Sequence, residues 1–118
     1  MDKLLEKMKE YLKMETELPF EEFSAYYNEV MGYLQQNYDG MGHEELFQAQ
    51  YILQIVASNA LARSQRKSNV SKKFRKMGEK ADFWYKAINY RLQKEGLSQE
   101  EIRAGVEAVN TEEVTAAE

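Results

Sequence analysis

The strongest candidate for chemistry in this sequence is a run of cationic side chains between residues 63 and 80. That segment holds eight basic residues and one acidic residue, although the chain of 118 residues carries a net charge of −4. Clustered Lys and Arg side chains bind phosphate groups, and the free N–H groups that start a following helix strengthen such a site. The segment therefore predicts a nucleic-acid or phosphate site formed by Arg63, Arg66, Lys67, Lys72, Lys73, Arg75 and Lys76.

The overall charge of the chain weighs against the nucleic-acid hypothesis. The sequence pI is about 5.2, whereas dedicated nucleic-acid-binding domains are usually basic. The alternative is a solvated helix end that balances the acidic residues 1–62, because cations near a helix C-terminus are favoured by the helix dipole. Cations at the start of the next helix oppose that dipole, and a bound anion would account for them.

An aromatic run of Phe83, Trp84 and Tyr85 is the second candidate. Consecutive helical residues point 100° apart, so the three rings cannot all face one core. Trp84 and Tyr85 fit the main apolar stripe, whereas Phe83 aligns with Ala87 and Tyr90 on a second edge. That edge either packs on another helix of the same chain or is exposed as an interface. As an interface it predicts a homo-oligomer or another protein partner, contacted by Phe83, Lys86 and Tyr90.

The sequence contains few residues that would indicate a catalytic site or a metal site. His43 is the only histidine, and its neighbours Glu44 and Glu45 are the nearest carboxylates in the sequence. A metal site needs three or four ligands that converge on one point, and this spacing alone does not predict such a site. The chain has no cysteine, hence no thiol nucleophile, and it has no glycine-rich phosphate loop or argued triad. We therefore expect a non-enzymatic protein without metal or cofactor. A small apolar ligand held between helices is a further alternative, because methionines and aromatic residues recur on the predicted stripes.

The elements that must position these residues are predicted to be helices. Good helix formers dominate, there is a single proline, and runs of β-branched residues are missing. Apolar spacing predicts an all-α, up-down helical bundle of four main helices plus a short C-terminal fifth helix. We expect residues 1–109 to form a single helical domain and residues 110–118 a disordered C-terminal tail. The predicted helices cover residues 3–15, 19–37, 44–67, 72–95 and 98–109.

The connection at residues 68–71 and the end of the fourth helix carry specific signals. Residues 68–71 are weak helix formers and predict a break, although one continuous helix over 44–95 is the alternative. Gly96 is suited to end the fourth helix, and Ser98 with Glu101 predicts a capping box for the fifth. The segment 44–62 is apolar almost all round, which predicts a central helix. The expected core includes Leu46, Ile52, Leu53, Val56, Phe74, Met77, Trp84 and Ile88.

Two remaining expectations concern polarity and location. Gln50, Gln54 and Ser58 form an i, i+4, i+8 row, which is either a thin wet strip or a set of buried hydrogen-bonding groups. The first thirteen residues are charged at every turn and lack the apolar core of a signal peptide. The longest charge-free stretch is also too polar for a membrane span. We therefore expect a cytoplasmic protein with no membrane partner.

Overall fold

The computed structural model describes residues 1–111, and its regular secondary structure consists of helices. Within that range there are five α-helices, one short 3₁₀-helix and no strand, so the all-α prediction is confirmed. Every predicted helix is present, and each boundary lies within three residues of its predicted place. The elements are α1 (Asp2–Leu12), α2 (Phe20–Asn37), η1 (Tyr38–Gly40), α3 (His43–Ser64), α4 (Ser71–Lys94) and α5 (Gln99–Thr111).

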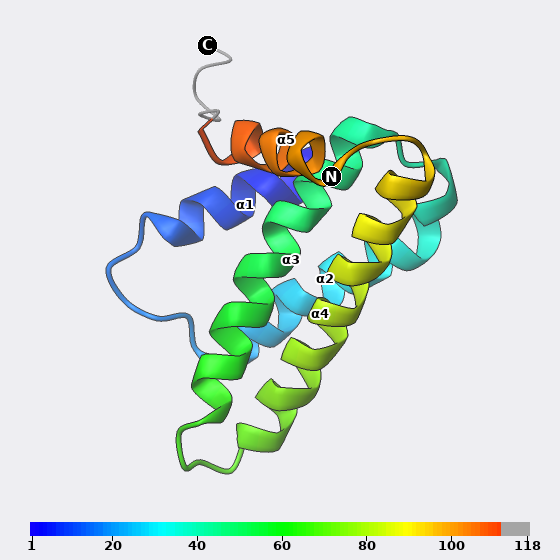
Figure 1. The fold of residues 1–118 in the computed structure, drawn as a ribbon. Helices are drawn as coiled ribbons and strands as arrows, with labels where there is room; N and C mark the ends of the chain where they lie inside the picture. Colours follow the sequence, from blue (N-terminus) through cyan, green and yellow to red (C-terminus); the bar gives the residue numbers. More distant parts are fainter. Residues whose placement is uncertain (112–118) are drawn as a thin grey trace.

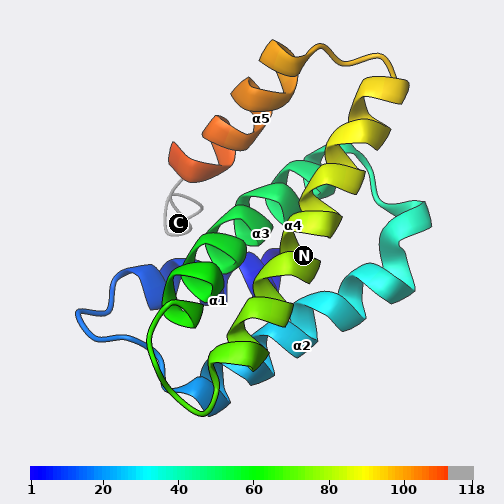
Figure 2. The ribbon, with the colours of Figure 1, turned by 60° about the horizontal axis from the view of Figure 1, so that its bottom comes forward.

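Helix α3 lies at the centre of the bundle, as its all-round apolar pattern indicated. It runs antiparallel to α4 along most of its length, and α1, α2 and α5 surround the pair (Figures 1 and 2). Leu46, Ile52 and Leu53 of α3 are completely buried. Large aromatic rings fill the space between α2 and α4, where Phe23 and Phe74 meet edge to face at 5.5 Å. The up-down bundle therefore has one tight helix pair at its core.

The α3–α4 turn is a true break, so the continuous-helix alternative is wrong. Helix α3 ends at Ser64, and residues 65–70 reverse the chain direction (Figure 1). Ser71 Oγ accepts a hydrogen bond from the Ser68 N–H at 3.2 Å and donates one to the Arg66 carbonyl. Serine side chains compete with helical hydrogen bonds in this way, which explains why a serine-rich segment ends the helix.

The α4–α5 connection follows its sequence signals closely. Gly96 has a φ of 103°, and its N–H donates to the Gln93 carbonyl while the Leu97 N–H donates to Leu92. This pair of bonds is a Schellman motif, which requires the left-handed conformation that glycine adopts without strain. Ser98 and Glu101 then form the reciprocal capping box, with bonds of 2.8 and 3.1 Å.

Most of the predicted core is buried, with one exception. Seven of the eight expected residues are buried, whereas Trp84 is only half-buried. Trp84 lies at the edge of the α4 stripe, where its large ring packs edge to face on Tyr38 at 5.2 Å instead of entering the core. The polar row on α3 is divided, because Gln50 is fully buried while Gln54 and Ser58 are exposed.

The chain departs from the prediction at two further ends. Helix α1 stops at Leu12 rather than at Glu15. The link at 13–19 instead crosses to the end of α3. There the two guanidinium NH2 nitrogens of Arg66 donate to the two carboxylate oxygens of Glu17 at 2.7 and 2.5 Å, which makes a bidentate ion pair. Helix α5 continues to Thr111, two residues into the segment expected to be disordered. The rest of that predicted tail, 112–118, lies outside the described residues.

No helix in residues 1–111 is both long enough and apolar enough to cross a bilayer.

Candidate interaction surface on helix α4

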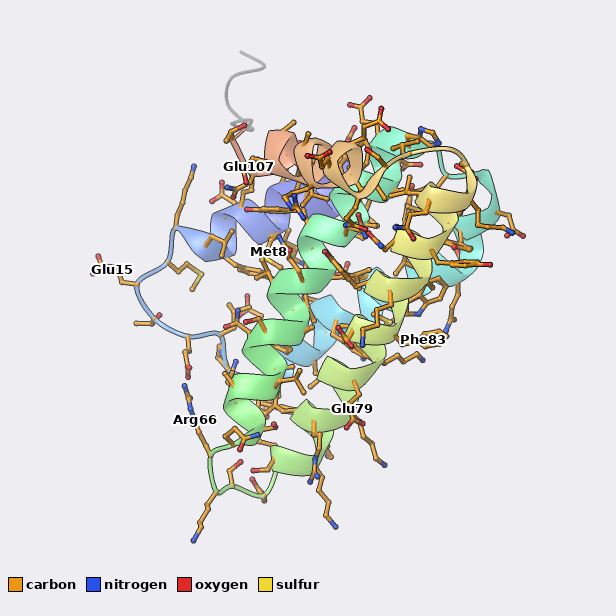
Figure 3. The ribbon with its side chains drawn as sticks, viewed as in Figure 1. Met8, Glu15, Arg66, Glu79, Phe83 and Glu107 are labelled. Atoms are coloured by element: carbon orange, nitrogen blue, oxygen red, sulfur yellow. The ribbon has the colours of Figure 1, made fainter. Side chains whose placement is uncertain are left out.

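Helix α4 has one face in the core and the opposite face in solvent. Its buried stripe packs against α3 and α2 and consists of Phe74, Met77, Gly78, Ala81, Ile88 and Leu92. Glu79 and Phe83 project from the other side of the helix, away from α3 (Figure 3). Because the stripe takes up only one side of 24 residues, the outer face is left free to contact a partner.

Two large aromatic side chains lie on this outer face. Phe83 is 66% exposed and Tyr90 is 62% exposed, the highest values among large hydrophobic residues in the described part of the chain. They are seven residues apart, which is two helical turns, so their rings lie on nearly the same line along the helix. The second apolar edge of α4 is therefore exposed at Phe83 and Tyr90 and does not pack on another helix of the same chain. Clustered exposed aromatic residues are typical of binding surfaces.

Charged residues flank the two rings in a symmetric pattern. Glu79 lies four residues before Phe83, and Lys94 lies four residues after Tyr90. Glu79 has no ion-pair partner among residues 1–111, and the Lys94 ammonium lies 5.7 Å from the centre of the Tyr90 ring. Lys86, between the rings, is already paired with Asp82 of the same helix at 3.0 Å. At 100° of rotation per residue, these charged residues and the two rings lie on one face of α4. The same helical spacing makes the positions of Glu79 and Lys94 beside the rings predictable from the sequence.

The basic segment does not form one cluster, because three of its seven candidate cations are engaged within the chain. Arg63 stacks over the rings of Phe23 and Phe74, with its guanidinium carbon 5.4 and 4.4 Å from their centres. Arg66 pairs with Glu17, and this pairing raises the pKa of Arg66 further. Lys73 Nζ lies 5.6 Å from the centre of the Phe20 ring.

The other four cations are exposed around the α3–α4 turn. They have no ion-pair partner among the residues that the structure describes, so their charge is available to a ligand. Two of them, Lys72 and Lys76, lie on the same outer face of α4 as Phe83, by the 100° rotation per residue. The remaining cationic group consists of Lys67, Lys72, Arg75 and Lys76.

His43 contacts a carboxylate at the end of α4. It begins α3, where its Nε2 lies 2.8 Å from Glu95 Oε1 at the end of α4. Arg91 donates to the other oxygen of Glu95 and to the carbonyls of Tyr38 and Met41. The Arg91 hydrogen bond, and after it the one to His43, hold the pKa of Glu95 below its ordinary value. Residues 1–111 contain no group of three or more His, Cys, Asp or Glu side chains placed to hold a metal.

A cavity under the α1–α2 link is a separate feature. Its volume is about 290 Å³, and α1, the link 13–19, α2 and α3 all contribute to its walls. Most of the lining is apolar, and Arg63 is among the few charged side chains in it. The sequence pattern indicates no position for a ligand between the helices, because the cavity depends on the path of the link 13–19 relative to α3.

No protein-family model matches the chain, and no curated protein and no solved structure matches it either.

Proposed function

We propose that this protein is a non-enzymatic interaction module that associates with a second copy of itself through the outer face of α4. The observation that carries the proposal is the pair of exposed rings, Phe83 and Tyr90, on the outer face of α4. Burying an aromatic side chain of this size contributes roughly 1.5–3 kcal/mol, so leaving two of them in water has a cost that a partner would remove. Aromatic residues also dominate the energetics of protein interfaces.

The pattern of residues on α4 suits a two-fold partner. In a symmetric dimer, residue i of one copy contacts residue j of the other, and the reverse contact is made as well. An antiparallel pair of α4 helices centred between residues 86 and 87 places Phe83 opposite Tyr90 of the second copy. The same register places Glu79 opposite Lys94 of the second copy, giving two aromatic contacts and two ion pairs. The spacing of four, seven and four residues is therefore self-complementary in shape and in charge.

Charge near the proposed axis is already balanced. The register brings the two copies of Lys86 close together, and like charges at short range would oppose association. Asp82 lies 3.0 Å from Lys86 in the same chain and offsets that repulsion. The cations Lys72 and Lys76 lie beyond the region of contact, where water and salt screen them.

The size of the contact sets the expected strength of association. The segment from Glu79 to Lys94 is sixteen residues long and therefore spans about 24 Å of helix. Contacts of this extent fall at or below the small end of specific interfaces, which bury about 1,200–2,000 Å² in total. We therefore expect a reversible dimer with a Kd in the micromolar range, about −8 kcal/mol, rather than an obligate one.

Sedimentation velocity over a range of protein concentrations tests the proposal. The wild type is expected to shift from monomer to dimer, and Phe83→Glu to weaken the dimer at least about thirtyfold, because a central aromatic anchor is worth about 2 kcal/mol. Met14→Glu is the matched control, since it introduces the same carboxylate at an exposed apolar residue away from α4. A wild type that remains monomeric at millimolar concentration would refute self-association.

Polyanion binding is a second candidate, favoured by the exposed cations Lys67, Lys72, Arg75 and Lys76. Such binding weakens steeply with salt, because bound counterions are released from the nucleic acid. Fluorescence anisotropy of labelled duplex DNA and single-stranded RNA at low and physiological salt is the test. Loss of binding in a variant that reverses the charges of Lys67, Lys72, Arg75 and Lys76 would support it.

The control for that assay reverses exposed cations elsewhere on the molecule. A variant with Lys3, Lys13 and Arg103 changed to Glu alters the net charge but leaves the α3–α4 turn intact. Equal loss of binding in both variants, or no binding at low salt, would refute a specific site at the turn.

A further inference from the structure

The cavity between α1, the 13–19 link, α2 and α3 has the chemistry of an amphipathic site. Leu12 and Met14 line it and are 51% and 46% exposed, so they leave apolar surface open to whatever fills the space. Leu18, Ile55 and Val56 extend the apolar lining toward the core. The link bows outward from α3 at this point, and Glu15 projects away from the helices (Figure 3).

Arg63 gives this cavity one cationic group with unused hydrogen-bonding capacity. The Arg63 side chain is 12% exposed, its guanidinium donates no hydrogen bond to any residue in 1–111, and its one ion pair there is a 4.0 Å contact with Glu17. Both oxygens of Glu17 are already bound by Arg66 at 2.7 and 2.5 Å. A guanidinium has five N–H donors, and a single 4.0 Å ion pair leaves donors of Arg63 available to a ligand. The group is held in place by the rings of Phe23 and Phe74, so it is preorganised to receive an anion.

From these observations we propose that the cavity binds a medium-chain carboxylate, with its alkyl chain against Leu12, Met14 and Ile55 and its carboxylate on Arg63. A cavity of about 150 Å³ holds benzene, which has six carbon atoms. The volume of about 290 Å³ therefore suits a ligand of about twelve non-hydrogen atoms, which is the size of decanoate. A guanidinium binds a carboxylate with two parallel hydrogen bonds, which matches the donors left free on Arg63. This site is on a different part of the molecule from the outer face of α4, and it does not depend on self-association.

Isothermal titration calorimetry with three ten-carbon probes tests this site. Sodium decanoate, decan-1-ol and decyltrimethylammonium are compared on the delipidated full chain, each below its micelle-forming concentration. Decanoate is expected to bind with one site per chain, more tightly than the alcohol, and the cation is expected to bind weakest. Equal binding of all three probes, preference for the cation, or no binding of decanoate would overturn the proposal. Preference for the cation would assign the rim to Glu15 and Glu17 instead.

Two substitutions locate the site. Arg63→Met removes the guanidinium but keeps an unbranched apolar side chain, and it is expected to weaken decanoate binding about tenfold or more, while decan-1-ol binding is unchanged. Asn59→Trp fills the cavity from α3 and is expected to abolish binding of both probes. Asn28→Trp is its matched control, because Asn28 is also exposed on a helix but does not line the cavity. Circular dichroism verifies that each variant is folded, and undiminished decanoate binding by folded Asn59→Trp would overturn the assignment.

Discussion

Replacing Gly78 by alanine tests the close packing of α3 and α4, on which the position of the outer α4 face depends. A Cβ atom at Gly78 would lie 2.7 Å from Leu61 Cγ and 3.2 Å from the Leu61 backbone nitrogen. The exposed Leu61 side chain can rotate away, but its backbone cannot, so the two helices must move apart by a few tenths of an ångström. Gly32 of α2 is the matched control, because a Cβ there meets nothing within 4 Å.

The two substitutions are expected to have opposite signs. Alanine in place of a helical glycine stabilises by about 1 kcal/mol through helix propensity alone, which is the whole effect expected for Gly32→Ala. Overpacking costs about 1–3 kcal/mol, so Gly78→Ala is expected to be destabilising by about 1 kcal/mol after the same gain is subtracted. For a chain of this size, 1 kcal/mol shifts Tm by about 4 °C.

Differential scanning calorimetry at one fixed protein concentration measures both variants. The two Tm values are expected to differ by about 8 °C, with Gly32→Ala above the wild type and Gly78→Ala below it. If Gly78→Ala raised Tm as much as Gly32→Ala, the close approach of α3 to α4 at this point would be refuted.

Three further predictions concern the core, a helix cap and the response to acid. Gln50→Met should raise the urea midpoint by the equivalent of about 1 kcal/mol. Gln50 Oε1 is buried without a partner among residues 1–111, and the hydrogen bonds of its Nε2 are long, at 3.4 Å. A lowered midpoint would show that this amide is well hydrogen-bonded. Ser98→Ala should cost about 1 kcal/mol by removing the hydroxyl that accepts a hydrogen bond from the Glu101 N–H in the first turn of α5, and faster amide exchange confined to α5 would identify the cause. Arg66 lowers the pKa of Glu17 and Arg91 lowers that of Glu95, so each carboxylate stabilises the fold above its ordinary pKa of 4.5, and that stability is lost as the pH falls through the lowered values. The double variant Glu17→Gln and Glu95→Gln should therefore show a flatter decline in Tm below pH 4.5, and an unchanged slope would contradict these pairings.

The helices and their ends could be predicted because their signals are local. The Schellman glycine at Gly96 and the capping box of Ser98 and Glu101 each act within a few residues of chain. The break at 68–71 was also predictable, since serine side chains offer the backbone hydrogen bonds that end a helix. The central position of α3 was predictable because a helix that is apolar almost all round must be covered by neighbouring helices on several sides.

The candidate sites depend on contacts between distant parts of the chain, which spacing alone does not give. Seven basic residues in one segment looked like a single anion site, yet Glu17, 49 residues away from Arg66, takes that guanidinium out of the group. The apolar stripe of α4 predicts Trp84 in the core, but its ring is only half-buried and packs on Tyr38, a contact between distant residues. The cavity depends on where the 13–19 link lies, and a segment without periodicity carries no signal for its path.

The most direct test of the proposed function exchanges the charges of the predicted ion pair on α4. Glu79→Lys and Lys94→Glu each place like charges opposite one another twice in a two-fold dimer, so each variant alone is expected to dimerise more weakly than the wild type, by about five- to thirtyfold. An equimolar mixture of the two variants restores both attractive pairs, and sedimentation velocity is expected to show heterodimers with close to wild-type affinity. A mixture that associates no better than the separate variants would contradict the antiparallel α4 register and, with it, the central claim.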